Sequence, residues 1–227
     1  KNAIIPGLYA YEAGQPAVGD LFEYSKNQAP KHIVDQANEH HMPVLNYLEE
    51  LASHIRIEEQ HVVVLDWLNG NRSILSNSHL TGSIFGLTLQ TPYEMIHRAY
   101  IEATAFGTKL IMKQFEDNHI PVHTVYASGG IPQKSKLLVE IYANVLNKRV
   151  VVIDSSNASA LGAAMLGANV GNAYSTLKEA ALSMKQPIAY IQEPEIQKVQ
   201  AYKPLYHKYC ELHDLLGRQY PELSYLI

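Results

Sequence analysis

The sequence places two adjacent glycines where a strand is expected to turn into a helix. Residues 124–127 are strand formers, Ser128-Gly129-Gly130 follow, and a helical apolar pattern occupies residues 133–146. Such a turn leaves backbone N–H groups unpaired beside a helix N-terminus, and glycines let a phosphate or nucleotide approach closely. The segment matches neither GxxxxGK[ST] nor GxGxxG, so a purely structural turn is the alternative.

A second polar turn follows the next expected strand. Asp154-Ser155-Ser156-Asn157 stands between a strand at 150–153 and a small-residue helix at 158–170. Ser and Asn are ordinary helix N-caps, so we favour a structural role for this turn.

Two charged residues in loops are further candidates. Glu12 lies in a Gly/Ala-rich segment, where it could accept a hydrogen bond from a substrate hydroxyl or be a solvated loop acid. Arg72 follows Asn69-Gly70-Asn71 and could be an anion ligand or a donor that fixes the loop, and we favour the second role.

Metal and nucleophile chemistry have weaker support in the sequence. The chain has eleven histidines but no HExxH, and the adjacent His40 and His41 would point in different directions on a helix. It has no GxSxG, and nothing places Cys210 near a base. We therefore expect neither a metal held by the chain's own side chains nor a covalent nucleophile.

The elements that must position these residues alternate between strand and helix. Strands are expected at 62–65, 124–127 and 150–153, and the longest helix at 92–117, with apolar residues at helical spacing. Shorter helices are expected at 18–28 and 44–60, and the chain after Tyr174 is expected to be helical with proline interruptions. This order predicts a layered α/β fold with right-handed crossovers.

Composition excludes several classes of protein. The 227 residues are 47% hydrophobic and 18% charged, which is typical of a globular domain. A net charge of −4 gives no electrostatic footprint for nucleic acid. The apolar runs are too short to span a membrane. One cysteine fits a reducing compartment, and we expect the cytoplasm. The chain begins without an initiator Met, and we expect it to be a piece of something larger.

Several motifs, in order, together resemble the carboxy-terminal lobe of the FGGY carbohydrate kinases. The resemblance covers nearly the whole chain and is more specific than any single motif. The segments that carry it are GLYAYEAGQPAVGD (7–20), LDWLNGNRS (65–73), GLTLQT (86–91), RAYIEATAFG (98–107), ASGGIPQK (127–134) and ALGAA (160–164).

The resemblance implies an actin-like, ribonuclease H-like α/β fold, with two lobes that enclose ATP and a sugar. It implies phosphoryl transfer from ATP, with Mg²⁺ bound through the ATP phosphates. The lobe would comprise residues 1–172, with a helical extension at 173–227 packed on it. The resemblance places the phosphate loop and the general base in an amino-terminal lobe of the same protein, and the Gly-Thr hairpin that usually opens the second lobe is missing here. Association of two copies as a homodimer is a further alternative.

Site residues carry over position by position. Ser128, Gly129 and Gly130 match the family's adenosine-binding turn, and Lys134 falls beside the nucleotide. Gly19 matches a glycine near the ATP phosphates. Glu12 matches an acid that faces the sugar pocket, which makes substrate binding the favoured role for it.

The motifs YEAGQ, NGNRS and SGGIPQK most resemble the sequences of family members that phosphorylate L-ribulose in L-arabinose breakdown. Alternatives are a kinase of another ketose or polyol, such as xylulose or glycerol, a non-catalytic actin-like module that binds nucleotide, or a degenerate lobe that binds nothing. Met95, Ser135 and Asn144 depart from the residues usual in the family.

Overall fold

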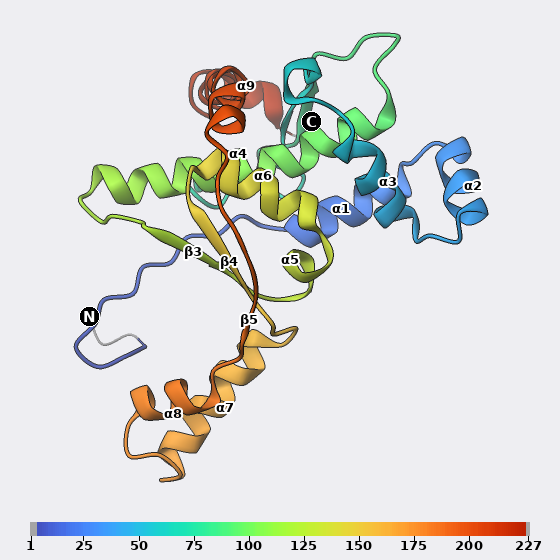
Figure 1. Ribbon diagram of the computed structural model, residues 1–227. Coiled ribbons are helices and arrows are strands. Elements are labelled where there is room, and N and C mark those ends of the chain that lie inside the picture. The colour runs from blue at the N-terminus through green and yellow to red at the C-terminus, as the bar shows by residue number, and fades with distance from the viewer. Residues whose placement is uncertain (1–3, 226–227) are drawn as a thin grey trace.

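A three-stranded sheet carries both strand–turn–helix units that the sequence predicts (Figure 1). In the computed structural model, which describes residues 4–225, β3 and β4 run parallel, with Val125 opposite Val150. Strand β5 pairs antiparallel with β4 on its other side. Val150, Val151 and Val152 of β4 are buried, as expected for β-branched residues in a central strand. The strands are β1 (Val63–Leu65), β2 (Ser83–Phe85), β3 (Thr124–Ala127), β4 (Arg149–Ile153) and β5 (Ile188–Gln192).

Helices cover this sheet and a separate antiparallel hairpin formed by β1 and β2. The helices are α1 (Val18–Asn27), α2 (Lys31–Glu39), α3 (Val44–Ser53), α4 (Tyr93–Asp117), α5 (Gly130–Lys134), α6 (Lys136–Leu146), α7 (Ala158–Val170), α8 (Leu177–Met184) and α9 (Ile196–Asp214), with short helical turns at Ile57–Glu59, Leu215–Gln219 and Pro221–Ser224.

The most strongly patterned elements form where the sequence predicts them. Strand β3 and helix α7 have the predicted bounds, and α4 follows Pro92 and ends at Asp117 as expected. Proline suits the start of a helix because its fixed φ is compatible with the first turn and its missing N–H would have no intrahelical partner.

Four expectations about elements were wrong. Helix α3 ends at Ser53 rather than near residue 60, and helix α2 was not predicted. The expected helix 133–146 is two helices, separated at Ser135, whose side chain accepts the Leu138 N–H and caps α6. The chain after Tyr174 is not entirely helical, because β5 joins the sheet. The division of the chain at residue 172 stays a prediction.

Helix α4 is the centre of the main hydrophobic core. About half of its length is buried continuously, from His97 to Gly107, between β1, α3, α6 and α9. From α9, the rings of Tyr202, Tyr206 and Tyr209 all pack against Phe106 of α4, with centroids 5.4 to 6.2 Å apart. These contacts place α9, which follows the predicted division, in the same core as α4.

A buried ion pair joins three helices within this core. The Arg98 guanidinium donates from Nε to Glu102 Oε1 at 2.8 Å, from Nη1 to the Ala52 carbonyl at 3.0 Å, and from Nη2 to the Tyr202 hydroxyl at 2.8 Å. The Tyr202 hydroxyl in turn donates to Glu102 at 3.1 Å. Burial raises the pKa of Glu102, and the positive charge of Arg98 opposes that rise. The two charges are therefore paired and hydrogen-bonded, as buried charges must be.

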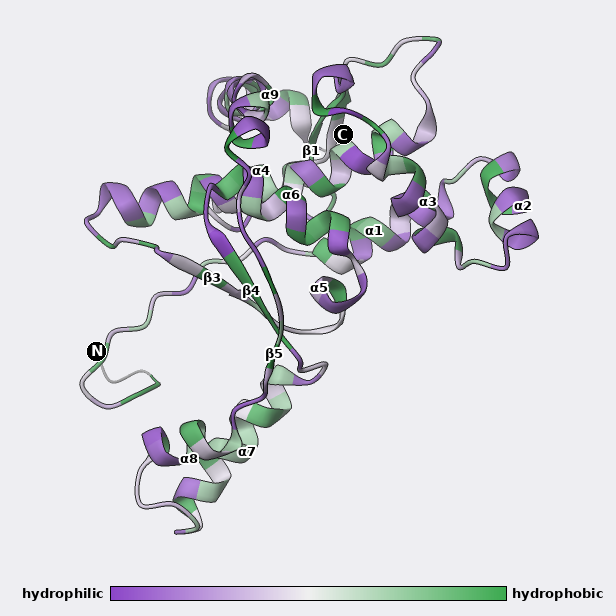
Figure 2. Ribbon diagram, viewed as in Figure 1, coloured by the Kyte–Doolittle hydropathy of each residue, from purple (hydrophilic) through white to green (hydrophobic). Residues whose placement is uncertain are grey.

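The hairpin of α7 and α8 projects from the rest of the molecule (Figures 1 and 2). All thirteen residues of α7 are at least partly exposed, and Leu166 and Val170 are 50% and 82% exposed. Figure 2 shows that much of this helix is apolar.

Strand β3 lies at an edge of the three-stranded sheet. Within residues 4–225, no helix is both long and apolar enough to cross a membrane.

We predict that Glu102→Gln lowers the free energy of unfolding by about 3 kcal/mol, because the buried Arg98 charge loses its partner. Denaturant unfolding followed by circular dichroism measures this loss. Glu116→Gln is a matched control on the same helix, since its pair with Lys148 is partly exposed and should contribute at most about 1 kcal/mol. Equally small losses for both variants would contradict a central role for Arg98–Glu102.

Two groups, the buried His97 and the partly exposed Asp66, should give the stability an opposed pH dependence. Burial lowers the pKa of His97 to about 4, so acidification through pH 6.5 to 4 should destabilise the fold. Burial raises the pKa of Asp66 to about 6, so the same acidification should stabilise it. We predict that His97→Gln becomes relatively more stable than the parent as pH falls through this window, and that Asp66→Asn becomes relatively less stable. Parallel pH profiles of unfolding free energy for all three proteins would contradict this assignment.

Candidate functional site

The Gly129–Gly130 turn lies at the carboxyl ends of β3 and β4, where parallel strands of an open sheet commonly present ligand sites. Gly129 has φ 97° and ψ −178°, a region that essentially only glycine adopts. A methyl group built on Gly129 or Gly130 would meet no described atom within 4 Å. The turn is thus held open on the side where a ligand can approach the backbone.

The structure joins this turn to the second polar turn, Asp154–Asn157. The Gly129 N–H donates to the Ser155 carbonyl at 2.9 Å, and Gln133 Nε2 reaches the Ile153 carbonyl at 3.3 Å. A cavity of about 420 Å³ lies beside the second turn, and Gln133 of α5 contributes to it; its lining is Gln133, Asp154–Asn157, Ala160, Leu161, Ala164 and Gln186. From the sequence, a structural role is favoured for the second turn. The signal that could have joined the two turns was the succession of two strand–turn–helix units.

Helix α1 brings Gly19 to the same region. A methyl group on Gly19 would lie 3.8 Å from Ile131 Cδ1, two residues beyond Gly129. Ala17 precedes α1 with a left-handed φ of 62°, which turns the chain sharply into the helix. The predicted nucleotide residues Gly19, Gly129 and Gly130 therefore come from two helix N-termini that lie side by side.

The other predicted nucleotide residues lie on the surface around the turn. Ser128 is exposed before Gly129, and Lys134 is exposed at the end of α5. Ser135, the next residue, is buried and hydrogen-bonds with Glu49 of α3. Burial raises the pKa of Glu49, and this hydrogen bond opposes the rise. The underside of the turn is thus attached to α3, while its outer face is open.

Glu12 occupies a different place, on the segment that leads into α1. Its Oε1 accepts from Arg72 Nη2 at 2.8 Å, with both side chains largely exposed. This geometry agrees with the favoured role of Arg72 as a donor that fixes a loop. Beside the pair, a cavity of about 340 Å³ is lined by Arg72, Pro16, Asn69, Asn71 and Asn77, among others.

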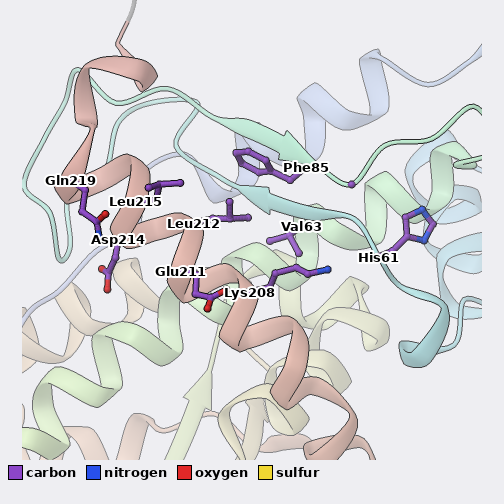
Figure 3. Close-up of a pocket in the computed structure, with 10 residues that line it drawn as sticks. His61, Val63, Phe85, Lys208, Glu211, Leu212, Asp214, Leu215 and Gln219 are labelled. Atoms are coloured by element: carbon purple, nitrogen blue, oxygen red, sulfur yellow. The ribbon is translucent and has the colours of Figure 1, made fainter.

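A larger cavity, of about 640 Å³, lies elsewhere, between the β1–β2 hairpin and α9 (Figure 3). Val63 and Phe85 line it from the strands, and Lys208, Glu211 and Asp214 from the helix side. The six residues predicted for ligand binding lie outside this cavity, whereas Arg72, the partner of Glu12, and Gln133, next to Lys134, line the two smaller cavities, so we do not assign the larger one to the site. Within the described residues, no group of three or more His, Cys, Asp or Glu side chains could hold a metal ion.

The fold, with its two joined strand–turn–helix units, agrees with the carboxy-terminal lobe of a carbohydrate kinase. The model for the FGGY family of carbohydrate kinases, C-terminal domain, matches residues 1–170. The chain belongs to this family.

Known relatives agree with this assignment. The chain is 71% identical over 226 residues to ribulokinase 1 of Staphylococcus saprophyticus subsp. saprophyticus. The aligned region covers 100% of this chain and 42% of the relative. It is 55% identical over 217 residues to the ribulokinase of Staphylococcus aureus (strain Newman), covering 96% of the chain and 40% of the relative. The chain therefore spans about two fifths of the length of these relatives.

Solved structures support the fold. The xylulose kinase of Rhodospirillum rubrum superposes with a TM-score of 0.71 at 22% identity, covering 89% of this chain and 39% of that one. The ligand-bound xylulose kinase of Lactobacillus acidophilus gives 0.74 at 20% identity, covering 91% and 39%. The expected actin-like, ribonuclease H-like fold of the carboxy-terminal lobe is thus confirmed.

We predict that Gly129→Ala weakens binding of ATP about tenfold, because the turn must then leave a backbone conformation that costs a non-glycine residue about 1–3 kcal/mol. Gly130→Ala is the matched control: its surroundings are equally open and its φ is not positive. Titration calorimetry with ATP measures both variants. Equal affinities for the two would contradict a role for the Gly129 conformation.

Proposed function

We propose that this chain is the ATP-binding carboxy-terminal lobe of a kinase that converts L-ribulose to L-ribulose 5-phosphate, a step of L-arabinose breakdown in the cytoplasm. The observation that carries the proposal is the 71% identity, over 226 residues, to a protein named ribulokinase 1. The aligned region includes every segment that builds the site, among them YEAGQ, NGNRS and SGGIPQK.

The geometry supports a division of labour within the lobe. The open backbone of the Gly129–Gly130 turn and the first turn of α1 at Gly19 would hold the adenosine and phosphates of ATP, since helix N-termini favour negative charge. Lys134 and Ser128 flank the turn on its exposed side. Glu12 would accept a hydrogen bond from a sugar hydroxyl. Mg²⁺, bound through the phosphates, supplies neutralisation of the charge that develops during phosphoryl transfer.

The lobe requires the rest of the longer protein for catalysis. The resemblance assigns the general base to the amino-terminal lobe, and phosphoryl transfer depends mainly on positioning between the two lobes. The open edge of β3 and the exposed apolar face of α7 support a partner segment that covers them. We assign that partner to the amino-terminal remainder of the same protein.

We predict that the full-length protein phosphorylates L-ribulose with a higher kcat/KM than D-xylulose or glycerol, and that the 227-residue chain alone shows no turnover because it lacks the base. A coupled assay that follows ADP formation measures both. Glu12→Gln should raise the KM for L-ribulose about tenfold, since a hydrogen bond to a charged group is lost, and leave the KM for ATP unchanged. Turnover by the isolated chain, or preference for another sugar, would contradict the proposal, and ATP binding without any sugar effect would indicate a non-catalytic module.

A further inference from the structure

The ion pair between Glu12 and Arg72 joins segments that are sixty residues apart in the chain. Arg72 Nη2 donates to Glu12 Oε1 at 2.8 Å, and the exposed fractions of the two side chains are 66% and 81%. Exposed pairs of this kind contribute roughly 0–1 kcal/mol to stability. Stability therefore gives little reason for the pair, and its geometry needs another explanation.

The backbone that carries Arg72 is closed into a fixed turn. Asn71 and Asn77 exchange two backbone hydrogen bonds, at 2.9 and 2.8 Å, and the Asn71 side chain accepts the Leu75 N–H at 3.1 Å. The Ser76 hydroxyl donates to the Arg72 carbonyl at 3.2 Å. Arg72 therefore extends from a rigid base.

The backbone that carries Glu12 is held on both sides of it. Before it, the ring of Tyr11 packs on Phe115, with centroids 6.2 Å apart. After it, the Gly14 N–H donates to Ser73 Oγ at 3.1 Å. Since the backbone is anchored at Tyr11 and Gly14, the direction of the exposed Glu12 side chain depends on its bond to Arg72.

Gly14 makes the approach of Arg72 possible. A methyl group at Gly14 would lie 3.3 Å from Arg72 Nη1 and 3.6 Å from Cδ, which is tight contact along the guanidinium and its stem. The missing side chain lets Arg72 lie against the backbone two residues after Glu12. The guanidinium then meets the carboxylate through one charge-assisted hydrogen bond, from Nη2 to Oε1.

We propose that Arg72 is a positioning residue, which holds the Glu12 carboxylate in the direction needed to receive a sugar hydroxyl. This inference rests on the proposed function. Arg72 engages Oε1, so the second oxygen of Glu12 can accept the bond from the sugar. Arg72 itself acts through Glu12 and makes no contact with the reacting groups.

The test uses the full-length enzyme with L-ribulose and ATP as varied substrates. Arg72→Met, which keeps the stem and removes the charge, should raise the KM for L-ribulose roughly fivefold, with the KM for ATP and the melting temperature unchanged. Arg72→Lys should recover part of the loss. Combining Arg72→Met with Glu12→Gln should give the KM of Glu12→Gln alone, because the two residues act as one unit.

Arg149→Met is the matched control, since Arg149 also forms an exposed ion pair, with Glu193, at the far end of β4. Its KM values should equal those of the parent enzyme. An unchanged sugar KM in Arg72→Met, while Glu12→Gln is impaired, would overturn the role of Arg72 and leave the proposed function intact.

Two other outcomes also decide the question. A raised KM for ATP in Arg72→Met, not reproduced by Glu12→Gln, would overturn the inference by making Arg72 a direct anion ligand. Failure of the parent enzyme to phosphorylate L-ribulose would overturn the proposed function, and the role of Arg72 with it.

Discussion

The buried ion pair of Arg98 and Glu102 is the constraint on which the rest of the lobe depends. Neither charge can be tolerated in the core unless the other is in place, so Ala52 of α3 and Tyr202 of α9 must arrive at fixed positions around them. Hydrophobic burial brings the helices together, but it does not specify their register. The directional bonds of Arg98 do so for three helices at once.

Helix α4 transmits that register to the site. Near the start of α4, His97 Nδ1 lies 2.8 Å from the Ser25 hydroxyl of α1, and α1 begins beside Ile131, next to the Gly129–Gly130 turn. Further along, Thr108 hydrogen-bonds with Gln15 at 2.9 Å, just after the segment that carries Glu12. The residues proposed for sugar binding and for nucleotide binding are thus both positioned by the same helix, although they are distant in sequence.

Periodicity and resemblance predicted the fold class, β3, α4, α7 and the family from the sequence alone. The errors arose where a distant contact decides the outcome: the Ala52 carbonyl accepts from Arg98 near the end of α3, and β5 exists because β4 offers it an edge. The site residues were predicted by their match to the family. Their contacts, such as Gly129 with Ser155 or Glu12 with Arg72, depend on tertiary folding that no local pattern encodes.

The central claim is that one lobe, built around α4, presents a nucleotide turn and a sugar-facing acid in a fixed relation. A crystal structure of the full-length protein with L-ribulose and a non-hydrolysable ATP analogue tests it most directly. The account predicts the nucleotide against Gly129 and Gly130, with its phosphates toward Gly19, and a sugar hydroxyl on Glu12 while Arg72 still holds that carboxylate. Nucleotide bound away from the Gly129 turn, or Glu12 directed away from the sugar, would contradict it.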